Sequence, residues 1–136
     1  MFDHNNEVIL STNDAATLSA VLATFSPHEA PGADALDELA EVLSGARVVT
    51  DDALGGDVVG LDAEVTYREL PGGARRTVRL VHPASADVSQ ARISVFAPVG
   101  RALLGRRAGA RVPVALPNGA IDELQVLAVD RAGRLS

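Results

Sequence analysis

The sequence of 136 residues contains no cysteine, no lysine and no tryptophan, and only four of its residues are aromatic. Without cysteine the chain has no disulfide, no thiolate metal site and no cysteine nucleophile. All twelve basic residues are arginine, which excludes a Schiff-base lysine and the lysines of phosphate-binding loops and kinases. Few aromatic rings remain for the stacking surfaces of RNA-recognition and single-strand-binding sheets.

Long apolar runs are also missing. No segment approaches the roughly 20 apolar residues that span a bilayer, and the first residues include Asp3 and Glu7 where a secretory signal would be basic and then apolar. We therefore expect a cytoplasmic protein with no membrane association. A hydrophobic content of 47% is enough for one ordinary domain, or a small domain with an appendage, and excludes a multidomain enzyme.

The net charge of −6 conceals an uneven distribution. Residues 1–52 contain ten acidic residues and one arginine, whereas residues 53–136 contain eleven arginines and eight acidic residues. Such a split indicates two modules with different surroundings. An acidic first module argues against nucleic-acid binding there, although acids that only solvate exposed helices explain it equally well.

The first module has helical periodicity. Residues 13–25 and a second segment ending at Gly45 both repeat apolar residues at helical spacing, and Thr12 or Asn13 is expected to cap the first helix. The break at 26–32 predicts a short antiparallel helical hairpin, coiled-coil-like, within residues 1–51. The apolar faces are Leu18, Leu22 and Phe25 in the first helix, and Leu36, Leu39 and Leu43 in the second.

The second module, residues 52–136, alternates and carries turn signals. Residues 47–60 lack periodicity and are interpreted as the connection between the modules. Pro98 and Gly105 bracket a short helix, and Pro113 inside a strand predicts an edge position. The fold class expected is α+β, with a small antiparallel sheet and one short helix. The strands are expected at 63–70, 75–82, 91–97, 111–116 and 120–130.

Catalytic motifs are missing. The glycines at 55–60 and 70–73 lack the context of a phosphate-binding loop, the histidines are scattered, and no serine has a nucleophile-elbow signature. We expect no catalytic residue, no metal and no cofactor. The tip of the hairpin, with His28, Glu29 and Asp34, leaves two alternatives open, a carboxylate pair that delivers a metal to another protein or a solvated turn.

Two stretches carry a family resemblance. Residues 92–119, RISVFAPVGRALLGRRAGARVPVALPNG, resemble the C-terminal domain of the Gre transcript-cleavage factors. Residues 63–87 look still more like one branch of that superfamily, the regulators of nucleoside diphosphate kinase (Rnk), because they contain the V-x-(F/Y)-R-x-L strand and the L-V-(Y/H)-P-A segment of that branch. The A-P-V-G-x-A-L-L-G motif of the same branch is present at residues 97–105. The resemblance covers residues 8–130 and is most specific at 63–119.

The resemblance implies an FKBP-like C-terminal domain and a non-enzymatic, monomeric regulator that binds core RNA polymerase at the rim of its secondary channel, without sequence-specific nucleic-acid binding. In the Gre factors this domain docks on the rim while a long coiled coil carries paired acidic residues to the active site. Here the arm is too short and the turn SPHEAPG lacks that pair. The resemblance therefore favours a competitor of Gre factors linked to control of nucleoside diphosphate kinase; the alternative is a cleavage factor of Gre type.

The expected docking surface lies in the A-P-V-G-x-A-L-L-G segment. Leu103 and Leu104 are not both expected to point inward from a one-turn helix, so one of them would be exposed. Ala110 replaces the aspartate usual in the superfamily, which removes either a partner contact or a turn cap. A prolyl isomerase pocket would need more aromatic lining than Tyr67 and Phe96 provide. The predicted partner-binding residues are Pro98, Val99, Arg101, Leu103, Leu104 and Arg106.

Overall fold

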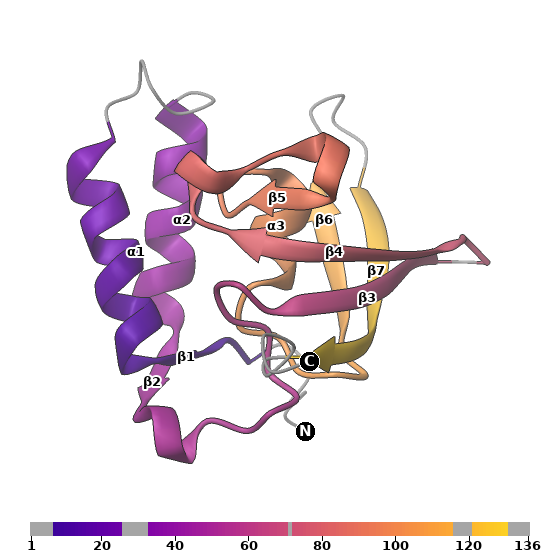
Figure 1. The fold of residues 1–136 in the computed structure, drawn as a ribbon, viewed down its shortest axis with the longest axis horizontal. Coiled ribbons are helices and arrows are strands. Elements are labelled where there is room, and N and C mark those ends of the chain that lie inside the picture. Colours follow the sequence, from indigo (N-terminus) through magenta and orange to yellow (C-terminus); the bar gives the residue numbers. More distant parts are fainter. Residues whose placement is uncertain (1–6, 26–32, 71, 116–120, 131–136) are drawn as a thin grey trace.

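The computed structural model describes residues 7–25, 33–70, 72–115 and 121–130. Two helices stand side by side next to a five-stranded sheet, and the turn between the third and fourth strands points away from the helices (Figure 1). The elements, in chain order, are β1 (Ile9–Ser11), α1 (Thr12–Thr24), α2 (Ala33–Gly45), β2 (Arg47–Val49), η2 (Asp51–Ala53), β3 (Glu64–Leu70), β4 (Arg75–Val81), η3 (Pro83–Ser85), η4 (Val88–Gln90), β5 (Arg92–Ser94), α3 (Pro98–Leu103), β6 (Arg111–Ala115) and β7 (Ile121–Asp130).

The expected cap of α1 was wrong by one or two residues. Ser11, in an extended conformation at the end of β1, accepts a hydrogen bond from the Asp14 N–H at 3.0 Å. Thr12 and Asn13 lie inside the first turn, and their side chains donate instead to the Val49 carbonyl and to the Asp51 carboxylate. The strand before the helix decides the cap, because it places Ser11 in the conformation that an N-cap residue needs.

Residues 47–60 are more than a connection. β2 pairs in parallel with β1, so the chain segments before α1 and after α2 form a two-stranded sheet. Farther along, Val58 and Val59 are buried, and Val59 is tied by its N–H to the Arg106 carbonyl at 2.8 Å. The local pattern did not reveal these elements because their partners lie far away in the sequence.

The main sheet has the strand order β5-β4-β3-β7-β6. The β3–β4 hairpin, the short helix and the β7 strand are as predicted, and Pro113 lies in β6 at the edge of the sheet. The prediction of a purely antiparallel sheet was wrong, because β4 and β5 pair in parallel. Two single-turn helices, η3 and η4, carry the chain back between them, so the crossover contains no long helix that the sequence would announce.

One hydrophobic core joins both halves of the chain. Leu18 of α1 and Leu39 of α2 belong to the same cluster of buried residues as Leu80 of β4 and Leu124 of β7. The Phe25 ring, at the end of α1, lies 5.6 Å from the Phe96 ring between centroids. The helices therefore pack on the sheet module and are not a free arm, while the boundary at residues 51 and 52 stays a prediction.

A candidate partner-docking site

The predicted docking segment forms α3 and the turn after it. Pro98 occupies the first turn, where its missing N–H costs nothing, and Leu104, which follows the last helical residue, is the C-cap with φ −57° and ψ 127°. Gly105 follows with φ +78°, and an added Cβ would meet the Val8 side chain and, at 3.0 Å, the Ile9 nitrogen. The Gly105 carbonyl accepts a hydrogen bond from the Ile9 N–H at 2.9 Å. This turn therefore holds β1 against the sheet module.

Leu103 and Leu104 are both fully buried, which contradicts the expectation that one would be exposed. The helix ends at Leu103, and the backbone changes direction at Leu104, so the two side chains enter the core although they are adjacent in sequence. These leucines support the surface from below and do not contact solvent. Val99 is partly buried and packs against the same core.

Arg101 holds α3 against α2. One terminal nitrogen donates to the Phe96 carbonyl, and the other lies 3.0 Å from the Glu38 carboxylate. The side chain is only 12% exposed. Because both ends of the guanidinium have partners within the fold, Arg101 positions the two helices and presents little of itself to a partner.

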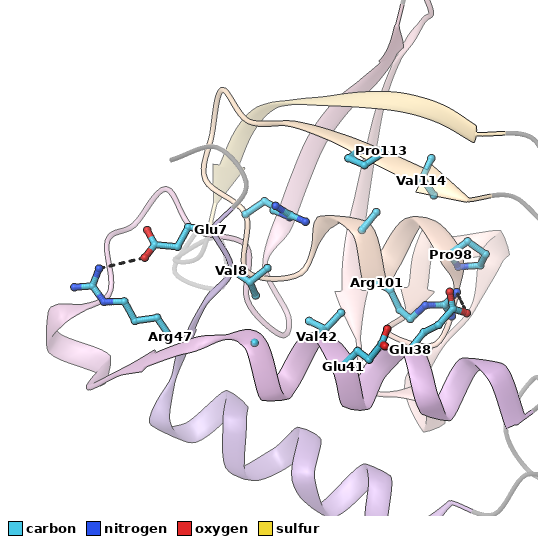
Figure 2. Close-up of a pocket in the computed structure, with 13 residues that line it drawn as sticks. Glu7, Val8, Glu38, Glu41, Val42, Arg47, Pro98, Arg101, Pro113 and Val114 are labelled. Atoms are coloured by element: carbon cyan, nitrogen blue, oxygen red, sulfur yellow. Dashed lines mark hydrogen bonds and ion pairs between the residues drawn. The ribbon is translucent and has the colours of Figure 1, made fainter. Parts of the chain in front are cut away.

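A groove of about 510 Å³ opens above α3. Figure 2 shows α2 along one side, α3 and β6 along the other, and Val8 at the end nearer β1. Pro98, Arg101 and Arg106 of the predicted set line it. The full lining is Glu7, Val8, Glu38, Glu41, Val42, Gly45, Arg47, Pro98, Arg101, Ala102, Arg106, Pro113 and Val114.

The groove combines an apolar floor with charges of both signs. Val8, Val42 and Ala102 pack against the core, while Glu7 pairs with Arg47 at 3.3 Å at the same end of the groove as Val8 (Figure 2). Burial lowers the pKa of the Arg106 guanidinium. Within the described ranges no three metal-ligating side chains come together.

Sequence reasoning missed the α2 wall of the groove. Glu38 and Glu41 lie three residues apart, so they share a helix face, and that spacing was the available signal. The sequence did not show that this acidic face lies opposite Arg101. At the other end of the helical pair, His28 and Glu29 lie outside the described residues, and only the backbone of Asp34, in the first turn of α2, is described.

Ala110 faces the core. Its side chain is fully buried, its N–H donates to the Arg107 carbonyl at 3.0 Å, and its carbonyl accepts from the Val126 N–H at 2.9 Å. The position offers no side chain to a partner.

No described helix is long and apolar enough to cross a membrane.

Comparison with known proteins identifies the family. The model for the C-terminal region of the transcription elongation factors GreA and GreB matches residues 54–131. The regulator of nucleoside diphosphate kinase of Escherichia coli K12 is 36% identical over 123 residues, which cover 90% of this chain and 88% of that protein. GreA of Bacillus licheniformis is 35% identical over 81 residues, which cover 60% of this chain and 51% of that protein.

The fold agrees with the sequence relationship. The solved structure of the prokaryotic transcription elongation factor GreA/GreB from Nitrosomonas europaea superposes with a TM-score of 0.71 and 30% identity, over 91% of this chain and 98% of that one. The resemblance expected from the motifs is thus confirmed. The chain belongs to the GreA/GreB family of transcription elongation factors and is similar over most of its length to the regulator of nucleoside diphosphate kinase.

Proposed function

We propose that this protein is an Rnk-like regulator, which binds RNA polymerase near the secondary channel and competes there with Gre-type factors without stimulating transcript cleavage. It acts in the cytoplasm as a monomer, its sheet module is FKBP-like, and its activity is linked to control of nucleoside diphosphate kinase. The relationship to the GreA/GreB family supports a partner of this kind.

The length of the helical arm formed by α1 and α2 is the observation that supports the proposed absence of transcript cleavage. α1 and α2 have 13 residues each, and at 1.5 Å per residue each is about 20 Å long. A factor that delivers a metal must reach the polymerase active site, and two helices packed on their own sheet module do not provide that reach.

The docking surface proposed is the groove between α2 and α3. Its exposed members, among them Glu41 and Pro113, are accessible to a partner, whereas Leu104 and Arg101 stabilise the fold beneath them. A charge substitution at either of the latter residues would disturb the core before it tested docking. Substitutions that test docking therefore belong at exposed residues that line the groove, such as Glu41 and Pro113.

A cleavage assay on backtracked elongation complexes with Mg²⁺ tests the proposal. The protein should add no RNA cleavage above the intrinsic rate of the polymerase, and should reduce Gre-stimulated cleavage as its concentration rises. Robust cleavage that disappears in Glu29→Ala would support the cleavage-factor alternative instead. No competition at saturating protein would remove the channel rim as the binding site.

Two matched charge reversals locate the surface. Glu41 and Asp37 are both exposed carboxylates of α2, and only Glu41 lines the groove. Glu41→Arg should raise the concentration needed for half-maximal competition by roughly 2- to 5-fold, the size expected for a rim charge. Asp37→Arg should leave it unchanged. Equal effects would mean that net charge, and not the groove, governs competition.

A further inference from the structure

The main sheet has one face in the core and one face toward solvent. Val65 and Tyr67 of β3 point into the core with Val126 of β7. Because side chains alternate along a strand, Thr66 and Arg68 point to the opposite face. We call this solvent side the outer face.

Three arginines form a row across the outer face. Arg75 of β4 is in register with Arg68 of β3, Arg68 with Gln125 of β7, and Gln125 with Arg111 of β6. Residues in register on adjacent strands project from the same face, so the four side chains stand beside one another. With strands about 4.8 Å apart, this arginine row spans roughly 14 Å.

The arginine row forms no ion pair in the described part of the chain. The ion pairs formed within the described ranges use Arg47, Arg79, Arg101 and Arg107, and none uses a member of the row. The nearest carboxylate by register on this face is Glu123, two residues from Gln125. The Arg68 Nε is buried and has no hydrogen-bond partner in the described part of the chain, so the fold leaves this one donor unsatisfied.

Neutral hydrogen-bonding groups adjoin the arginine row. Gln125 lies within it, and one register level away the hydroxyls of Thr66 and Thr77 lie 3.0 Å apart. Tyr67, the aromatic residue of β3, is on the core face and buried. Beside the carboxylates of Glu64 and Glu123, the described outer face therefore offers guanidinium, amide and hydroxyl groups but no ring for base stacking.

The charges of the molecule are segregated in space. α2 carries the acidic residues Asp37, Glu38 and Glu41, whereas Arg68 and Arg75 lie at the end of the β3–β4 hairpin that points away from the helices (Figure 1). In a chain of net charge −6, an arginine row that begins at the end of the molecule away from the acidic helix and forms no described ion pair gives a local field for an anion.

We infer that the arginine row binds the phosphodiester backbone of a single nucleic-acid strand without reading its sequence. Guanidinium groups bind phosphate oxygens in a planar, bidentate geometry, and hydroxyl and amide side chains are usual additional donors to phosphate and sugar. The row places three guanidinium groups along roughly 14 Å, so each can contact a phosphate of the same strand. This inference does not rest on polymerase binding, and the assay below contains no polymerase.

An acidic peptide fits this surface less well. A peptide that pairs with a sheet lies along an edge strand and binds through its backbone, but the arginine row runs across the strands, from β4 through β3 and β7 to the edge strand β6. A peptide added at that edge would lie beside one end of the row only. A phosphate backbone can follow the whole row because it presents a fixed anion at every repeat.

Fluorescence anisotropy of a labelled oligouridylate, from about 25 to 200 mM salt, tests the inference. Three phosphate contacts on a single strand predict that log K falls against log salt with a slope of roughly −2. Arg75→Gln should reduce the size of that slope by about 0.7 and weaken binding severalfold. Arg76→Gln is the matched control, because it removes the same charge from the adjacent, exposed residue on the opposite face, and it should bind like the unchanged protein. Circular dichroism melts verify that both variants fold.

Each result decides the question. Equal affinity for oligouridylate and oligothymidylate supports recognition of the phosphate backbone. Equal losses in Arg75→Gln and Arg76→Gln, or no binding at the lowest salt, would overturn it. Binding restricted to one base sequence would overturn it as well. Salt-sensitive self-association that Asp37→Asn abolishes would show that the acidic helix of a second copy occupies the row, and would also overturn it.

Discussion

Leu39→Ala tests whether the helices and the sheet are one cooperative unit. Leu39 is a fully buried residue of α2 in the cluster that also contains Leu80 and Leu124 of the sheet. Truncation of a buried leucine costs about 2–5 kcal/mol from lost burial and the cavity left behind. Against a typical stability of about 5–15 kcal/mol, this lowers the melting temperature by roughly 10 °C.

Two probes separate the modules in the same sample. Tyr67 is the one tyrosine of the chain, and there is no tryptophan, so tyrosine fluorescence reports on the centre of the sheet. Circular dichroism at the helical minimum reports mainly on α1 and α2. If the core is continuous, both transitions coincide in the unchanged protein and move together in Leu39→Ala. Val48→Ala, at a position 49% exposed, is the control and should shift neither by much.

A transition of Tyr67 that stays in place while the helical signal melts earlier would refute this reasoning. It would show that the hairpin unfolds alone, as the sequence interpretation of separate modules at 1–51 and 52–136 implies.

The remaining predictions concern Arg101, Gly105 and Tyr67. Arg101→Met should lower the free energy of unfolding in urea by about 1–3 kcal/mol, because it leaves the Phe96 carbonyl without its donor. Glu38→Gln, at the more exposed end of the ion pair, should lower it by less than about 1 kcal/mol. Equal losses would show that the ion pair is the main interaction. Gly105→Ala should destabilise by more than about 2 kcal/mol, since φ is positive and β1 occupies the space of the new Cβ, while Gly45→Ala, with open space around it, should be neutral or slightly stabilising in the same thermal melts. Burial raises the pKa of Tyr67 above its ordinary value of 10.0, so the unfolded chain deprotonates first and stability should fall as pH rises above 10; Tyr67→Phe should remove that part of the fall, and an unchanged pH profile would contradict it.

Much of the sheet module follows from local chemistry that the sequence displays. The Pro-Gly-Gly turn at 71–73 separates two alternating strands, and Pro98 with Gly105 brackets the short helix, because these residues restrict or free the backbone wherever they occur. Pro113 predicts an edge strand for the same local reason. The motifs at 63–119 were enough to identify the family, since they reflect these local constraints.

The pairing of strands that lie far apart in the chain could not be predicted from the sequence. Nothing in residues 9–11 or 47–49 indicates that the two segments would form a parallel pair, and the parallel β4–β5 pairing depends on two short turns with no helical period. Strand register is decided by how buried faces meet in three dimensions. A sequence pattern shows which residues of a strand share a face, but it does not show which other strand pairs with that strand or in which register.

The two candidate surfaces show the same division. The sequence indicated the α3 segment, but the structure alone decided that Leu103 and Leu104 are core, that Arg101 is tied to Glu38 across 63 positions, and that α2 supplies the second wall of the groove. The arginine row was likewise invisible, because Arg68, Arg75 and Arg111 become neighbours only through the registers of four strands. Composition determined how many charges the chain has, whereas tertiary structure decided which of them stand together, because only folding fixes the distances on which electrostatic interaction depends.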